Sequence, residues 1–156
     1  MHNDQTRVAR TLAPERGAVA IISNSRAELL LHLRDDVPDI AWPGYWSLLG
    51  GGCDGNEHEV DAIQRELNEE AGLGDQVDSL RRVCELRDEL GSGQLITFFS
   101  AHWDGDETQL PLTEGVKLQF FAPEFLDGLK IPFFIRDGIN RYLDTVKPLR
   151  TRRRPR

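Results

Sequence analysis

Residues 51–73 read GGCDGNEHEVDAIQRELNEEAGL, and this stretch carries the strongest structural signal in the chain. A period of 3.6 residues places four apolar side chains on one narrow side of a helix: Val60, Ile63, Leu67 and Ala71. Gly72, which follows, is the residue type that most often ends a helix. We therefore expect a helix over about residues 57–71 that packs its apolar side against a sheet.

Acidic residues border that apolar side. The stretch contains seven Asp and Glu residues against a single base, Arg65. Glu66 lies one helical turn from Glu69 and Glu70, and like charges at these spacings repel each other. One interpretation is an acidic helix face in contact with solvent. The other is a cluster that binds a hard divalent cation, and Mg²⁺ is the usual ion where phosphates are also present. The closeness of the acids to the sheet favours the cation.

Three consecutive glycines, residues 50–52, precede the helix. Glycine lets the backbone approach a ligand closely or adopt positive φ. A plain turn would explain them as well. The acids in the first turn of the helix argue against a phosphate bound at its N-terminus.

The spacing of these residues resembles the Nudix box: Gly, five residues, Glu, seven residues, then Arg-Glu-apolar-any-Glu-Glu-any-Gly-apolar. All nine constrained positions are filled at the right spacing. They are Gly51, Glu57, Arg65, Glu66, Leu67, Glu69, Glu70, Gly72 and Leu73. Outside the box, the strand pattern before it and residues 113–126 look like a small MutT-like member of the family.

The resemblance implies an α/β fold, with an α/β/α sandwich around a mixed sheet. It also implies metal-dependent cleavage of a nucleoside diphosphate linked to another group. The metal is expected to be Mg²⁺, with Mn²⁺ as an alternative, and the partner a small nucleotide substrate. Many members of the family dimerise, so a homodimer stays open.

Residue roles follow from the box positions. Glu66, Glu69 and Glu70 resemble the metal-binding acids, and Glu66 or a neighbour resembles the group that takes a proton from water. Arg65 resembles the residue that holds a box glutamate by an ion pair. Glu57 resembles a residue that supports the metal-binding acids from the next layer of contacts. The carbonyl of Gly51 is a further expected metal contact.

Three residues outside the box are weaker candidates. Glu114 precedes a predicted strand, where relatives often place an extra metal-binding or base carboxylate; a plain loop acid is equally consistent. Arg34 either binds a phosphate or pairs with an adjacent aspartate, Asp35 or Asp36. Trp42, beside Pro43, is the best candidate to stack on a base.

Length and composition limit the other classes. The chain has 156 residues, 39% apolar and 29% charged, with a net charge of −7, as expected of one globular domain. No apolar run approaches the roughly 20 residues of a membrane span. The acidic balance argues against a duplex-DNA binder. Both cysteines are isolated and the N-terminus lacks a secretion signal, so we expect a cytoplasmic protein with reduced thiols.

The remaining pattern interleaves strands and helices, which is typical of a mixed sheet. Strands are expected at residues 18–23, 28–34, 76–89, 94–103 and 116–122, and a final amphipathic helix at 131–146. Core positions are expected for Phe120, Phe121, Phe133 and Phe134. The domain should span residues 17–147, between a flexible arm at 1–16 and a basic disordered tail at 148–156.

The favoured function is therefore a hydrolase that converts a nucleoside or deoxynucleoside triphosphate, ordinary or oxidised, to the monophosphate and pyrophosphate. A nucleotide sugar or another nucleoside diphosphate derivative is the alternative substrate. A non-catalytic nucleotide-binding regulator is a second alternative, against which the intact acids argue. A third is an RNA-associated protein that uses the RTRRRPR tail as a basic arm.

Overall fold

The fold is that of a computed structural model, in which residues 15–146 are described. The arm expected at residues 1–16 lies outside this range except for its last two residues, and the tail expected at 148–156 lies wholly outside it. Arg16 already belongs to the first strand, one residue before the expected boundary.

Strand β1 (Arg16–Ser23) is central in a mixed seven-stranded sheet. It pairs in parallel with β6 (Leu95–His102) along its whole length. It also pairs antiparallel with β4 (Leu49–Gly52) and, at its end, with β2 (Leu29–Leu33). Because β1 has neighbours on both edges and is buried over six consecutive residues, it is apolar without interruption, as a strand covered on both faces must be.

The outer strands complete the sheet. Strand β5 (Asp78–Arg87) pairs antiparallel with β6, while β3 (Trp46–Ser47) and β7 (Lys117–Phe121) both pair antiparallel with β2. The five strands that the sequence predicted are all present. Strands β3 and β4 were not predicted: β3 has only two residues, and the glycines of β4 have little intrinsic preference for a strand.

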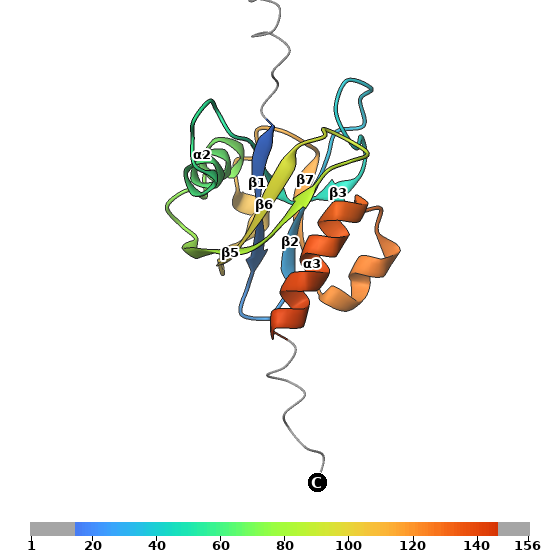
Figure 1. The fold of residues 1–156 in the computed structure, drawn as a ribbon. Coiled ribbons are helices and arrows are strands. Elements are labelled where there is room, and N and C mark those ends of the chain that lie inside the picture. The colour runs from blue at the N-terminus through green and yellow to red at the C-terminus, as the bar shows by residue number, and fades with distance from the viewer. Residues whose placement is uncertain (1–14, 147–156) are drawn as a thin grey trace, which may run out of the picture.

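Two α-helices cover the sheet on opposite sides, α2 (Glu59–Ala71) and α3 (Phe133–Val146) (Figure 1). The side chains of β1 alternate between the two layers: Ala18, Ala20 and Ile22 pack with α2, whereas Val19 and Ile21 pack with α3. Two short 3₁₀ helices, η1 (Glu107–Gln109) and η2 (Pro123–Gly128), lie in the connections. The expected α/β/α arrangement around a mixed sheet is confirmed.

Helix α2 begins two residues later than expected, because residues 54–57 form a turn closed by the bond from Glu57 N to Asp54 O at 2.9 Å. Its C-terminus is as predicted. Gly72 takes a left-handed φ of 67°, and the backbone N–H of Leu73 donates to Leu67 O.

Helix α3 also begins two residues late. The expectation that Phe133 lies in the core is wrong: it is 75% exposed, because it is the first residue of the helix and faces solvent there. No helix in residues 15–146 is long and apolar enough to cross a membrane.

Candidate active site

Helix α2 turns one of its acids into the protein interior. Its buried residues are Ala62, Ile63, Leu67, Glu70 and Ala71. At about 100° per residue, Glu70 falls only about 20° from Ile63, near the centre of this buried face. Glu70 is accordingly 4% exposed, whereas Val60, which was expected on the buried side, is 41% exposed. The buried face is therefore rotated towards the acids.

Arg65 connects the acids of the helix with the loop before it. Its guanidinium donates to both carboxylate oxygens of Glu57, at 2.9 and 3.0 Å, and to the Gly52 carbonyl at 3.0 Å. It also donates to Glu66 at 2.9 Å and to Glu69 at 3.2 Å. Five donors in a rigid planar fork suit such an arrangement, which no lysine could reproduce. Arg65 thus holds three glutamates at once.

Glu57 acts as the anchor of Arg65. Hydrogen bonds from Arg65 and, second to them, from the backbone N–H of Asp54, which donates at 3.0 Å, together lower the pKa of Glu57 to about 2. A carboxylate with so low a pKa is a poor proton acceptor near neutral pH. The geometry therefore suits Glu57 to holding Arg65 and not to acting as a general base.

Gly51 gives Glu66 the space it occupies. A Cβ atom at position 51 would lie 2.7 Å from both Cδ and Oε1 of Glu66. Any side chain there would push the carboxylate away from the backbone of β4. This close approach explains why the stretch needs glycine at this position.

Glu66 and Glu70 lie next to each other inside the protein, where Glu70 is almost fully buried. The pKa of Glu70 is raised to about 9, mainly by burial and also by Glu66 and Glu114, while a hydrogen bond from the Gly50 backbone acts against them. A carboxyl group with so high a pKa is protonated near neutral pH. The cluster thus gathers more negative charge than it can keep ionised without a cation.

Glu114 approaches this cluster from a loop that is fastened to α2. The backbone N–H of Thr113 donates to Glu70 O at 3.0 Å, and its hydroxyl donates to Glu69 O at 3.0 Å. Helix carbonyls in the last turn lack partners within the helix, so the loop and the helix end satisfy each other. These bonds place Glu114 next to the acids.

The same loop is fastened to β2 on its other side. The backbone N–H of Gly115 donates to Asp35 at 3.1 Å, and His32 Nε2 lies 2.8 Å from the carbonyl oxygen of Glu114. Burial lowers the pKa of His32, so the ring is neutral near pH 7. Because a carbonyl only accepts, we assign the Nε2 proton to this bond.

A cavity of about 400 Å³ collects these groups, a volume typical of small-molecule sites. Six of the predicted site residues line it: Arg34, Trp42, Gly51, Glu66, Glu69 and Glu114. The other three do not line it. Arg65 and Glu70 instead contact residues that do, and Glu57 binds Arg65.

Arg34 is held by its backbone neighbours and not by an acid. Its Nε donates to Ala41 O at 2.8 Å. Neither of the ion pairs weighed from the sequence, with Asp35 or Asp36, is formed in the part of the chain that the structure describes; Asp35 binds Gly115 instead. The guanidinium therefore keeps its charge available at the cavity wall.

The donor chemistry of the cluster fits a hard divalent cation. Glu66, Glu69, Glu70 and Glu114 supply only oxygen donors, and Gly51 opens the space beside Glu66. Within residues 15–146, no group of three or more His, Cys, Asp and Glu side chains is already arranged so that it could hold a metal ion. Two of the carboxylates are instead turned towards Arg65.

Comparison with known proteins decides the family. The sequence matches the NUDIX domain over residues 13–138, which is most of the chain. The chain belongs to the NUDIX family. As a Nudix hydrolase it is an enzyme of the class that the box predicted.

Three similar proteins illustrate the match. The RNA pyrophosphohydrolase of Gluconacetobacter diazotrophicus is 26% identical over 139 residues, which cover 80% of this chain and 83% of that protein. The nucleoside triphosphatase NudI of Escherichia fergusonii is 42% identical over 52 residues, only 33% of this chain and 36% of that protein. The MutT protein of Methanosarcina mazei shares the fold with a TM-score of 0.65 at 21% identity, over 85% of this chain and 94% of that one.

Sequence reasoning about this Nudix hydrolase missed Arg16. Its guanidinium forms an ion pair with Glu59 and donates to the Glu57 carbonyl at 3.0 Å. Arg65 is the only base within residues 51–73, but β1 brings a second base, Arg16, to the acids from outside that stretch. Arg16 lies 41 residues before Glu57, so no local pattern could have shown the contact. Thr113, His32 and Asp88 were missed for the same reason.

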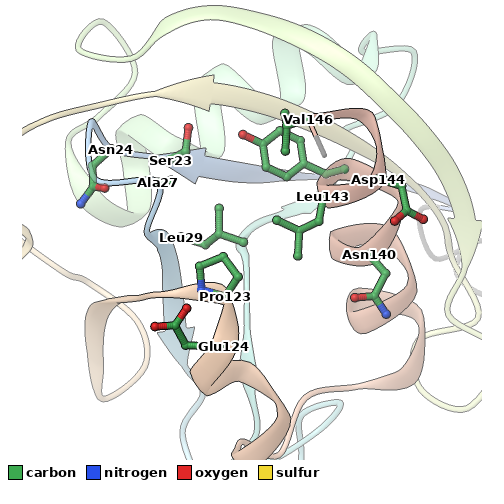
Figure 2. Close-up of a pocket in the computed structure, with 11 residues that line it drawn as sticks. Ser23, Asn24, Ala27, Leu29, Pro123, Glu124, Asn140, Leu143, Asp144 and Val146 are labelled. Atoms are coloured by element: carbon green, nitrogen blue, oxygen red, sulfur yellow. The ribbon is translucent and has the colours of Figure 1, made fainter. Parts of the chain in front are cut away.

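The Nudix hydrolase has a larger cavity elsewhere, of about 710 Å³, between the β1–β2 turn, η2 and the C-terminal half of α3 (Figure 2). Leu29, Pro123 and Leu143 face this space (Figure 2). Its lining includes two acids, Glu124 and Asp144, but no Lys or Arg among the described residues. Such a lining does not suit a phosphate, whereas the smaller cavity is lined by Arg34 and by six of the predicted site residues in all.

Proposed function

We propose that this Nudix hydrolase cleaves a nucleoside diphosphate linked to another group, and that its substrate is a nucleoside or deoxynucleoside triphosphate, ordinary or oxidised. One observation carries the proposal: a single cavity is lined by carboxylates, by the guanidinium of Arg34, which forms no ion pair within residues 15–146, and by the ring of Trp42. The carboxylates would bind a cation, the guanidinium a phosphate and the aromatic ring a base. The triphosphatase and pyrophosphohydrolase activities in the names of two relatives agree with it.

The acids are the proposed holders of a divalent cation, Mg²⁺ or alternatively Mn²⁺. Glu66, Glu69 and Glu70 would bind it, with Glu114 and the Gly51 carbonyl as further donors. When bound, such an ion neutralises phosphate oxygens and lowers the pKa of a water molecule. Arg65 and Glu57 would hold the carboxylates in place.

The residues of the chain supply the remaining steps. The oxygen of water forms a bond to the α-phosphorus, the bond from that phosphorus to the bridging oxygen breaks, and pyrophosphate leaves with the bridging oxygen. A carboxylate takes the proton released from water. Glu69 suits this role because its side chain is 59% exposed, against 16% for Glu66, so it can pass the proton on to solvent. Arg34 binds a phosphate of the substrate.

The test is a substrate screen with Mg²⁺ in water enriched in ¹⁸O. The panel holds the common and oxidised nucleoside triphosphates, nucleotide sugars, ADP-ribose and a short RNA with a 5′-triphosphate. Phosphate and pyrophosphate are measured separately. We expect a triphosphate to give pyrophosphate, with the label in the monophosphate. If only a nucleotide sugar or only RNA is turned over, the proposed triphosphate substrate is wrong.

Variants show whether the turnover belongs to this site. Glu69→Gln and Glu70→Gln each remove one negative charge and keep the side-chain shape, so both should abolish most of the activity. Glu124→Gln makes the same change on η2, at an exposed residue that lines the larger cavity and not the one with the acids, and should leave activity intact. Absence of turnover with the whole panel, or full activity in the two site variants, would refute the proposal.

A further inference from the structure

Trp42 has an unusual backbone conformation beside the proposed active site. Its φ is +54°, and in residues 15–146 only one other non-glycine residue, Ala27, has a positive φ. A bulky side chain in this region is strained and persists only where the surroundings enforce it. The contacts that hold the Trp42 ring are therefore informative.

Asp88 makes the main polar contact with this ring. The indole Nε1 donates to Asp88 Oδ1 at 3.0 Å, across 46 residues of sequence. Asp88 is only 3% exposed, and its other oxygen accepts from the backbone N–H and the hydroxyl of Ser92, at 2.8 and 3.0 Å. A buried carboxylate is costly unless hydrogen bonds satisfy it, and here the indole supplies one of the three.

The turn between β5 and β6 is shaped around this contact. A Cβ atom at Gly91 would lie 2.4 Å from Trp42 Nε1 and 2.6 Å from Asp88 Oδ2. Any side chain at position 91 would therefore displace either the indole or the carboxylate. Glycine here leaves the space that the Trp42–Asp88 pair occupies.

Further contacts fix the loop that carries Trp42. The Arg34 side chain donates to the carbonyl of the preceding residue, Ala41, at 2.8 Å. The Tyr45 ring meets the indole edge to face, with 5.2 Å between ring centroids. The indole is thus ordered while it lines the cavity that also holds Glu66 and Glu114.

We propose that Asp88 is a positioning residue, which holds the Trp42 indole as a preformed stacking wall for the base of the substrate. This inference rests on the proposed function. A ring already ordered in the free enzyme loses little conformational freedom on binding. Stacking of a base on an aromatic ring contributes about 5- to 100-fold in affinity and tolerates every base. The enzyme should therefore prefer nucleotides over base-less polyphosphates without distinguishing strongly among bases by this contact.

The test compares two probes that cannot be cleaved between their phosphorus atoms. These are adenosine α,β-methylene diphosphate and methylenediphosphonate, which has no base, both measured by calorimetry with Mg²⁺. Asp88→Ala should weaken binding of the adenosine probe by about 5- to 100-fold and leave that of methylenediphosphonate within about twofold. Asp88→Asn keeps an acceptor for the indole and should restore most of the affinity for the adenosine probe.

Two more variants separate positioning from a general structural role. Asp88→Ala added to Trp42→Phe should cause no further loss, because Asp88 acts through the indole. Gly91→Ala keeps the carboxylate but displaces the ring, so it should reproduce the base-dependent loss even if Asp88→Ala fails to fold. Asp104→Ala is the matched control, since Asp104 joins two other loops by bonds to Ser25 away from the cavity.

Each outcome decides the inference. Equal weakening of both probes in Asp88→Ala, or unchanged binding of both there and in Gly91→Ala, would overturn it. Because the experiment measures the affinity for the probes, its result does not depend on whether the enzyme turns over a substrate. A protein that cleaves no nucleotide refutes the proposed function, whereas a protein that cleaves nucleotides with full affinity in these variants refutes only the role of Asp88.

Discussion

Arg65 and Glu57 form a two-point ion pair: Nε and Nη2 of the arginine donate to the two carboxylate oxygens at 3.0 and 2.9 Å. The pair joins the turn before α2 to the middle of the helix. With Glu57 on one side, the remaining donors of the guanidinium point to Glu66, Glu69 and the Gly52 carbonyl. The position of the reactive acids therefore depends on this one contact.

Arg65→Lys should lower activity much more than it lowers stability. Lysine keeps the charge but cannot bind both oxygens of Glu57 while also reaching Glu66. Loss of contacts that orient metal ligands typically costs about 10- to 100-fold, and we expect that loss in kcat/KM. The control is Arg141→Lys, at an arginine that forms an exposed i,i+4 pair with Asp137. This variant should change neither activity nor stability. Equal activity in the two variants would show that the network is not needed.

Acid stability should depend on Glu57. The pKa of this carboxyl in the folded protein is about 2, below its ordinary value of 4.5. A lowered pKa means that its contribution is complete above about pH 4.5 and is lost as the pH falls towards 2. The free energy of unfolding, from urea titrations between pH 6 and 2.5, should therefore fall less steeply for Glu57→Gln than for the unmodified protein. Parallel curves would contradict the assignment.

Glu70→Gln should stabilise the metal-free protein and abolish its activity. Burial raises the pKa of Glu70, so the folded state loses stability as pH rises above the ordinary carboxyl range. Glutamine keeps the acceptor for Gly50 and donates to Glu66 without a proton to take up. We expect a gain of about 1–3 kcal/mol in unfolding free energy near pH 8 without metal. If the variant is less stable than the unmodified protein, ionised Glu70 does not destabilise the folded state.

Binding of Mg²⁺ should release protons. The pKa of Glu70 is raised to about 9, so this carboxyl group holds a proton near neutral pH, and a cation would displace that proton because metal ligands must be deprotonated. Calorimetric titration in two buffers of different ionisation enthalpy should give different apparent enthalpies, and affinity should rise with pH. Glu70→Gln is the matched variant and should remove the buffer dependence. Identical enthalpies for the unmodified protein would exclude this coupling.

Thr113→Val tests whether the loop places Glu114. The substitution keeps the shape but removes the hydroxyl that donates to Glu69 O. One hydrogen bond contributes about 0.5–1.5 kcal/mol, so kcat/KM should fall by about 2- to 10-fold. Thr145→Val removes a comparable bond, to Tyr142 O at the end of α3, and should leave activity unchanged. An unaffected Thr113→Val would leave Glu114 without a positioning role.

The sequence by itself determined the family, the helix with its glycine end and the five longer strands. These features are local or depend on fixed spacings, and the box constrains nine positions within 23 residues. It could not predict strands β3 and β4, because β4 is built from glycines whose conformation is set by pairing with β1. The helical period wrongly placed Val60 on the buried side. Packing against the sheet decides which side of the helix is buried, and the helix alone does not.

Only the tertiary structure decided how the candidate residues meet. It brought Arg34, Trp42 and Glu114 to the cavity of the box acids, supplied Arg16 to Glu59 and connected Trp42 to Asp88 across 46 residues. Such contacts leave no trace in local spacing, because they form only when strands distant in sequence pair in one sheet. The acidic stretch therefore indicated the chemistry, whereas the packing of β1, β2 and the β5–β6 turn around it decided the shape of the site.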